Sequence, residues 1–102
     1  MAAKKHKTNK PYVVVRTYSA GVHVGTLDKQ SADGKRVWLS GARGIWRWFG
    51  ANTLHEISLR GIDTTTSRVS DVVAQIDLTE AIEVIPCAPE GRKALEEASW
   101  VA

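Results

Sequence analysis

Continuous and alternating runs of apolar residues divide the chain into short extended segments. Residues 12–18 are dense in β-branched and aromatic side chains and do not alternate, which is typical of a central strand. Residues 22–27 alternate, with Val22 and Val24 on one face and His23 on the other. The same reasoning predicts further strands over residues 36–39, 42–49, 69–78 and 79–85.

Turn-forming residues separate these runs. Asp33-Gly34 is the dipeptide favoured in tight hairpin turns, so residues 22–27 and 36–39 are predicted to pair antiparallel. Gly41 is expected to end the strand over 36–39 before a separate strand starts at residue 42.

Two short helices are predicted. The first covers residues 54–60, with Asn52 or Thr53 as its N-cap and Gly61 just past its end. The second covers residues 90–98 and begins after Pro89, a residue that suits the first helical position. Thr79 is also able to cap a helix, which leaves a helix over residues 79–85 as the alternative to a strand.

Together these elements predict an α+β fold, a mainly antiparallel β-sheet of four to six strands with two short helices. Short connections and a hairpin argue against a parallel βαβ sheet. Residues 11–102 are expected to form a single compact domain, because a chain of 102 residues leaves little room for a second one. Residues 1–10 are expected to form a disordered basic arm.

Composition excludes several classes of protein. The chain has 102 residues and no apolar run long enough to span a bilayer. No apolar stretch follows the first lysines, so residues 1–10 are not expected to act as a secretory signal. Its single cysteine, Cys87, excludes an intramolecular disulfide. We therefore expect no membrane association and a location in the cytoplasm.

The positive charge is concentrated at the N-terminus. The formal net charge is +3, but without the four lysines of residues 1–10 the chain has ten basic residues against eleven acidic ones. The arm is therefore either a contact for nucleic acid phosphates or a solubilising leader.

No motif for catalysis is present in the sequence. It has neither a glycine-rich dinucleotide loop nor a phosphate-binding P-loop. His6, His23 and His55 have no second ligand at helical or strand spacing, and Cys87 is expected to be a small buried residue rather than a nucleophile. We expect no cofactor, no metal and no enzymatic activity. An enzyme with a site assembled from His23, His55 and nearby carboxylates is the third reading.

The stretch from Arg43 to Phe49 carries the most informative chemistry. In extended geometry Arg43 and Arg47 share one face, and Trp46 and Trp48 share the other, with the two indoles about 7 Å apart. The guanidinium fork suits phosphate, and an indole stacks on nucleobases. One face must meet the core, and burying two unpaired guanidinium groups costs more, so the tryptophans are expected inside a single subunit. A ligand held between subunits of a homo-oligomer would use both faces.

A second candidate element is the turn at Tyr18-Ser19-Ala20-Gly21. Its hydroxyl groups, small side chains and backbone N–H groups are able to hold an anion. The alternative is an ordinary hairpin turn.

Three segments resemble a family of small tailed-phage proteins. They are residues 15–22 with Tyr-Ser-Ala-Gly-Val, residues 42–48 with Ala-Arg-Gly-Ile-Trp-Arg-Trp, and residues 78–83. The resemblance runs from about Tyr12 to Trp100. The family's usual Ala-Arg-Arg-Ile-Trp has Gly44 in place of its second arginine here, so a paired guanidinium at that point is not available.

The resemblance implies a phage accessory or counter-defence protein in the host cytoplasm. Combined with the residue chemistry, it predicts a non-enzymatic homo-oligomer that binds a small anionic ligand, as a sponge that sequesters a nucleotide signal of host immunity. The candidate ligand-binding residues are Tyr18, Ser19, Arg43, Trp46, Arg47 and Trp48. The alternative is a module that binds nucleic acid through the basic arm, or one that inhibits a host protein.

Overall fold

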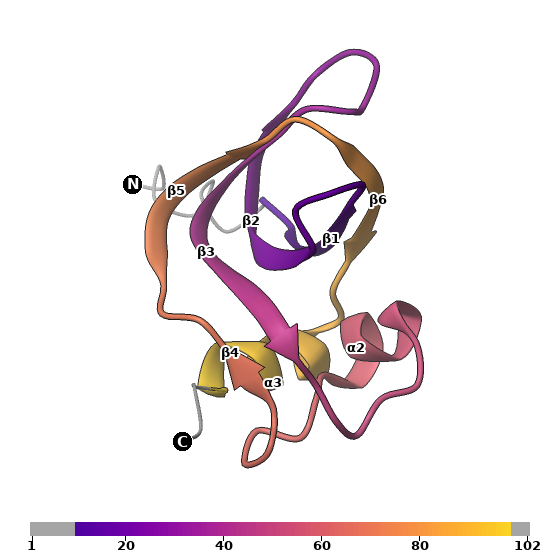
Figure 1. The fold of residues 1–102 in the computed structure, drawn as a ribbon, viewed down its shortest axis with the longest axis vertical. Coiled ribbons are helices and arrows are strands. Elements are labelled where there is room, and N and C mark those ends of the chain that lie inside the picture. The colour runs from indigo at the N-terminus through magenta and orange to yellow at the C-terminus, as the bar shows by residue number, and fades with distance from the viewer. Residues whose placement is uncertain (1–9, 99–102) are drawn as a thin grey trace, which may run out of the picture.

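The structure, a computed structural model, describes residues 10–98, in which one β-sheet packs against two helices (Figure 1). The strands are β1 (Tyr12–Thr17), β2 (Val22–Gln30), β3 (Val37–Arg47), β4 (Arg68–Val69), β5 (Val73–Leu78) and β6 (Ala81–Pro86). The helices are α2 (Leu54–Arg60) and α3 (Pro89–Glu97). The predicted α+β fold class is confirmed. Residues 1–9 of the predicted arm lie outside the described residues.

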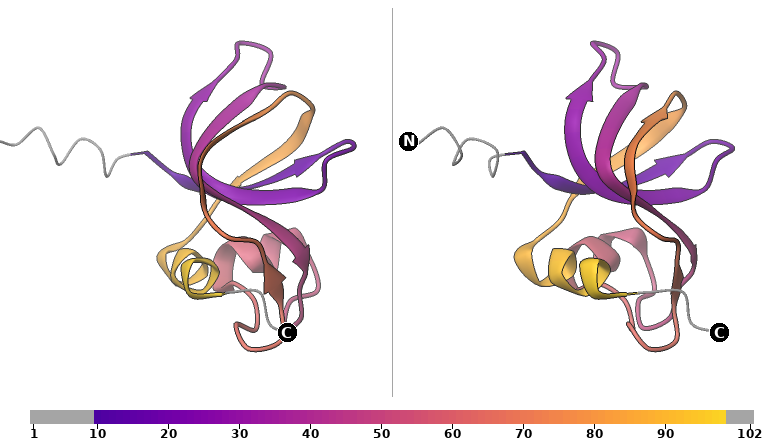
Figure 2. Two further views of the ribbon diagram at one scale, coloured as in Figure 1. Left: turned by 60° about the vertical axis from the view of Figure 1, so that its left-hand side comes forward. Right: turned by 90° about the vertical axis from the view of Figure 1, so that its left-hand side faces the viewer.

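The sheet is an antiparallel meander whose last strand returns to the first. Its strand order is β4-β3-β2-β1-β6. Strand β5 also pairs with β3, on the same edge as β4: β5 pairs with the first half of β3, and β4 pairs with its end. Only Thr79 and Glu80 separate β5 from β6, so the two ends of the strand order meet at that connection (Figure 1). The sheet is therefore curled, and both helices lie at one end of it, beside β4 (Figure 2).

Strand β1 separates two hydrophobic cores. Val13 and Val15 face the inside of the curled sheet, where they pack in a cluster with Leu39. Tyr12 and Val14 face the helices and pack in a cluster with Leu95 and other buried residues. The prediction of a central strand over residues 12–18 is confirmed, because a strand buried on both faces has no polar alternation.

The predicted break at Gly41 is wrong, because β3 continues through it. The pairing of β2 with β3 shifts between Val24 and Thr26, so that β3 holds one extra residue there. Gly41 has a positive φ of 56°, which lets the strand bulge and bend without ending. The expected strands over 36–39 and 42–49 are thus a single strand.

The predicted strand over residues 69–78 is interrupted between β4 and β5. The Ser70 hydroxyl accepts a hydrogen bond from the Gly44 N–H at 2.8 Å, and the Ser70 N–H donates to the Gly44 carbonyl at 2.8 Å. A side chain thus replaces part of the backbone ladder at this point. Residues 81–86 form a strand, which settles the alternative of a helix over 79–85.

Both helices begin and end close to where the local signals place them. The Thr53 hydroxyl accepts from the Glu56 N–H at 3.2 Å, and the Gly61 N–H donates to the Ile57 carbonyl at 2.8 Å. α3 begins with Pro89. The two helices pack so closely that a Cβ added at Gly91 would collide with the Ser58 carbonyl.

We predict that Gly91→Ala destabilises the protein, although alanine favours a helix by about 1 kcal/mol over glycine. The new methyl group must push α3 away from α2, so we expect the free energy of unfolding to fall by about 1–3 kcal/mol. Urea denaturation measures this change. Lys93→Ala on the exposed side of the same helix is the control. A Gly91→Ala protein as stable as the wild type would contradict the close contact.

Candidate functional site

The structure does not bring the six predicted ligand-binding residues together. Tyr18 and Ser19 lie exposed in the turn between β1 and β2. The other four lie along β3 and just beyond its end. Arg43 is buried, Trp46 and Arg47 are exposed, and Trp48 is half-buried.

The turn at Tyr18 and Ser19 has its polar groups engaged within the protein. The Ser19 hydroxyl donates to the Glu80 carboxylate, and the Ala20 N–H donates to the Thr17 hydroxyl at 2.8 Å. The Ser19 hydroxyl and the Ala20 N–H therefore already have partners within the protein. The geometry therefore favours an ordinary hairpin turn over an anion-binding one.

Arg43 is a structural residue, with only 7% of its surface exposed. Its Nε donates to the Ser70 carbonyl at 2.9 Å, and its Nη1 donates to the carbonyls of Leu95 and Glu96 at 3.0 and 3.2 Å. The last two acceptors belong to the final turn of α3, whose carbonyls have no partner within the helix. The expectation that this guanidinium faces a ligand is corrected: backbone carbonyls supply the partners that make its burial possible.

The predicted division of residues 43–48 into an arginine face and a tryptophan face is wrong after Ile45. The pairing of β3 with β4 shifts between Ile45 and Arg47, which inserts Trp46 as an extra residue. Trp46 is therefore 63% exposed, although tryptophan was expected in the core. Trp48 is half-buried and packs against the core cluster shared by β1 and the helices.

We predict that Arg43→Gln lowers the free energy of unfolding by about 3 kcal/mol, because it leaves buried carbonyls without donors. Arg47→Gln is the matched control on the same strand, and its exposed side chain should change stability by less than about 0.5 kcal/mol. Urea denaturation of both variants checks this. Equal stability of the two variants would refute the structural role of Arg43.

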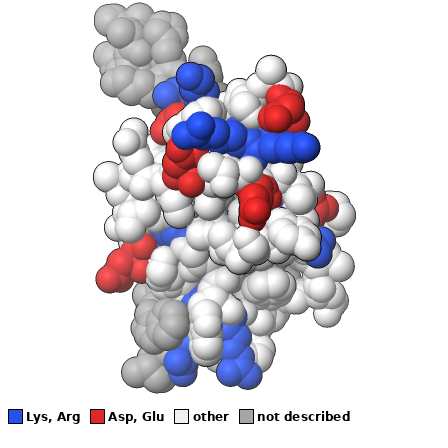
Figure 3. All heavy atoms as spheres, turned by 45° about the horizontal axis from the view of Figure 1, so that its top comes forward, with Lys and Arg blue, Asp and Glu red and all other residues white. Residues whose placement is uncertain are grey.

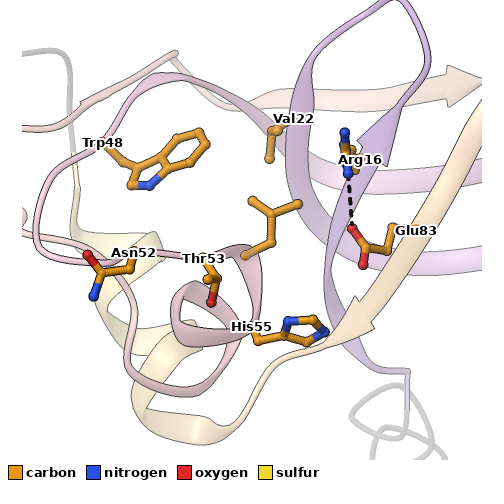
Figure 4. A pocket seen from close by; sticks show the side chains of 8 residues that line it. Arg16, Val22, Trp48, Asn52, Thr53, His55 and Glu83 are labelled. Carbon is orange, nitrogen blue, oxygen red and sulfur yellow. Dashed lines mark ion pairs between the residues drawn. The ribbon is translucent and has the colours of Figure 1, made fainter.

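Trp48 lines a cleft of about 480 Å³ that the sequence did not reveal (Figure 4). The other lining residues come from β1, β2, β6 and the segment that begins α2; they are Arg16, Val22, Asn52, Thr53, Leu54, His55 and Glu83. Of these residues, Trp48 was a candidate for ligand binding, and His55 was named only in the alternative reading as an enzyme. The rest could not be grouped in advance, because they lie on four separate segments of the chain.

The cleft has an apolar wall and polar groups facing it. Val22, Leu54 and the Trp48 indole supply the apolar surface. Arg16 and Glu83 lie across the cleft from Trp48, on paired positions of β1 and β6 (Figure 4). Their closest N and O atoms are 3.9 Å apart, and both side chains remain partly exposed.

This arrangement is able to bind a planar, polar molecule. A ring placed in the cleft would contact the indole, while the Arg16 guanidinium donates hydrogen bonds and the Glu83 carboxylate accepts them. Among residues 10–98, no three His, Cys, Asp or Glu side chains are placed to hold a metal ion.

Cys87 does not have the environment of a nucleophile. Burial raises the pKa of its thiol from 9.0 to about 11, and the positive charge of Arg92 only partly offsets this effect.

We predict that Cys87 reacts slowly with a disulfide reagent at pH 8, because a two-unit rise in pKa lowers the thiolate fraction about 100-fold. Since the raised pKa favours the thiol, the rate should increase about tenfold per pH unit up to pH 11. The absorbance of released thionitrobenzoate measures it, with the guanidinium-unfolded protein as the control. Equal rates for folded and unfolded protein would contradict the burial.

Comparison with known proteins assigns the chain to a family. A family model described as a domain of unknown function (DUF6948) matches residues 10–95, so the chain belongs to that family. No curated protein and no solved structure matches it. In the part of the chain that the structure describes, no helix is long and apolar enough to cross a membrane.

Proposed function

We propose that this member of the DUF6948 family binds a small anionic, nucleotide-like ligand in the Trp48 cleft and retains it without chemical change. The observation that carries the proposal is a half-buried indole that faces a guanidinium and a carboxylate across one open cleft (Figure 4).

Trp48 supplies the stacking surface. Its side chain packs against the buried cluster, so part of the indole is held by the core while the rest lines the cleft. A ring held in this way loses little side-chain entropy when a base stacks on it, and such stacking contributes about 1–3 kcal/mol per base.

Arg16 and Glu83 supply complementary polar groups. Their side chains are 58% and 37% exposed and 3.9 Å apart, so their mutual attraction contributes little to stability. A ligand therefore separates them at low cost. Arg16 then pairs with an anionic group, and Glu83 accepts N–H groups from the edge of a base, a combination that a nucleotide offers.

The biological setting we infer is that of a phage accessory protein in the host cytoplasm that acts as a sponge for a nucleotide immune signal. Its support is the resemblance of three sequence segments to small tailed-phage proteins and the chemistry of the cleft. A sponge needs tight retention and no turnover. A homo-oligomer would multiply the number of clefts without adding new chemistry.

We predict that the full chain binds nucleoside monophosphates or cyclic dinucleotides in isothermal titration calorimetry, and the matching uncharged nucleosides more weakly. Arg16→Gln should weaken nucleotide binding about tenfold and remove the preference over nucleosides. Trp48→Leu should weaken both kinds of ligand. The ligand should be recovered intact after denaturation.

The controls are Trp38→Leu and Arg36→Gln, which change the same residue types outside the cleft. Because Arg16 is exposed, its variant stays informative even if Trp48→Leu fails to fold. Equal losses in the control variants, or no binding by the wild type, would refute the proposal. Conversion of the ligand would favour the enzyme reading.

A further inference from the structure

We propose a second binding surface, at the end of the β3–β4 pair, that takes single-stranded nucleic acid. We call it the β3–β4 tip and define it as Trp46, Arg47, Phe49 and Arg68. None of the four lines the Trp48 cleft.

Two arginines face one another across the β3–β4 tip. Arg47 of β3 and Arg68 of β4 are directly paired positions of antiparallel strands. Like charges directly opposite one another destabilise a sheet. The pairing thus places a second arginine next to Arg47.

Arg47 differs from the other exposed arginines of the described chain. Arg16, Arg36, Arg60 and Arg92 each have a carboxylate oxygen within 4.0 Å, whereas Arg47 has no carboxylate partner among residues 10–98. Its guanidinium lies over the Phe49 ring instead, 5.2 Å from the ring centre. No carboxylate of residues 10–98 therefore neutralises its positive charge.

Exposed aromatic rings accompany these charges. Trp46 is 63% exposed and Phe49 is 44% exposed, and the Arg68 guanidinium lies 5.7 Å from the Trp46 ring centre. Each ring is large enough to stack with a base, and arginine adds planar and cationic contacts to such stacks.

A second arginine–tryptophan contact in the sheet differs from the β3–β4 tip, because its arginine is paired with a carboxylate. Arg36 lies 4.8 Å from the centre of the Trp38 ring, but it also donates two hydrogen bonds to Asp77, at 2.6 and 3.0 Å. The charge there is neutralised within the protein, and Trp38 is half-buried. At the β3–β4 tip, by contrast, Arg47 lies over an exposed ring and has no carboxylate partner among residues 10–98.

Charged side chains are distributed over both ends of the molecule. Acidic and basic side chains are intermingled at the upper end in Figure 3, and basic side chains are also visible at the lower end. That lower end holds β4 and the helices (Figure 1).

Single-stranded nucleic acid fits the tip better than a lone small anion. It presents phosphates and unpaired bases in alternation, and residues 46, 47 and 49 present rings and charge in alternation along an extended segment. A small anion would use the guanidinium groups and leave both rings exposed.

The test is the fluorescence anisotropy of a labelled 12-nucleotide oligothymidylate, titrated with the full chain at several salt concentrations. Arg47→Gln should weaken binding at least about fivefold and reduce the slope of log affinity against log salt by about 0.7, the value for one lost phosphate contact. Phe49→Leu should weaken binding about tenfold and leave that slope unchanged.

Arg36→Gln is the matched control, because it removes an arginine that also lies on an indole but is neutralised by Asp77. Its affinity and salt slope should equal those of the wild type. The lysines of residues 1–10 are the same in every variant, so their contribution cancels in the comparison.

Three results would overturn the proposal. The first is a loss in Arg36→Gln equal to that in Arg47→Gln, which would indicate a general charge effect. The second is an unchanged salt slope in Arg47→Gln. The third is competition by polyglutamate as effective as that by unlabelled oligothymidylate, which would indicate a surface for acidic proteins.

Discussion

The arrangement of sheet and helices depends on the guanidinium of Arg43. It donates hydrogen bonds to Ser70 between β4 and β5 and to the last turn of α3, so one buried side chain joins three parts of the chain. The positive charge also suits the C-terminal end of a helix, where the carbonyls concentrate partial negative charge. Through α3, this contact fixes α2, because the Ala88 N–H donates to the Ser58 carbonyl at 2.8 Å. The segment that begins α2 forms one side of the Trp48 cleft.

Local signals in the sequence predicted the elements that are stabilised locally. The cap of α2 at Thr53, its end at Gly61 and the start of α3 at Pro89 depend on residues a few positions apart. The continuation of β3 through Gly41 depends instead on its pairing with β2, which no local pattern contains. The interruption of the strand predicted over residues 69–78 likewise depends on the partner that Gly44 offers to Ser70.

The side-chain positions in the candidate site likewise depend on strand pairing that no local pattern contains. Simple alternation along residues 43–48 predicted one arginine face and one tryptophan face, but a bulge at Trp46 redistributes the side chains. Arg43 becomes part of the framework, Trp46 and Arg47 reach the surface, and Trp48 lines the cleft. The tryptophan pattern identified one residue of the cleft, whereas Arg16 and Glu83 carry no sequence signal beyond ordinary strand polarity.

One short segment positions both proposed binding surfaces. The backbone at Phe49 is tied on both sides: its N–H donates to the Ser67 hydroxyl at 3.0 Å, and its carbonyl accepts from the Asp63 N–H at 2.8 Å. These bonds hold the chain just after Trp48, so the indole in the cleft and the ring at the β3–β4 tip are fixed by the same contacts. Two chemically different surfaces are thus obtained from one irregular strand end, because a bulge separates side chains that regular alternation would place together.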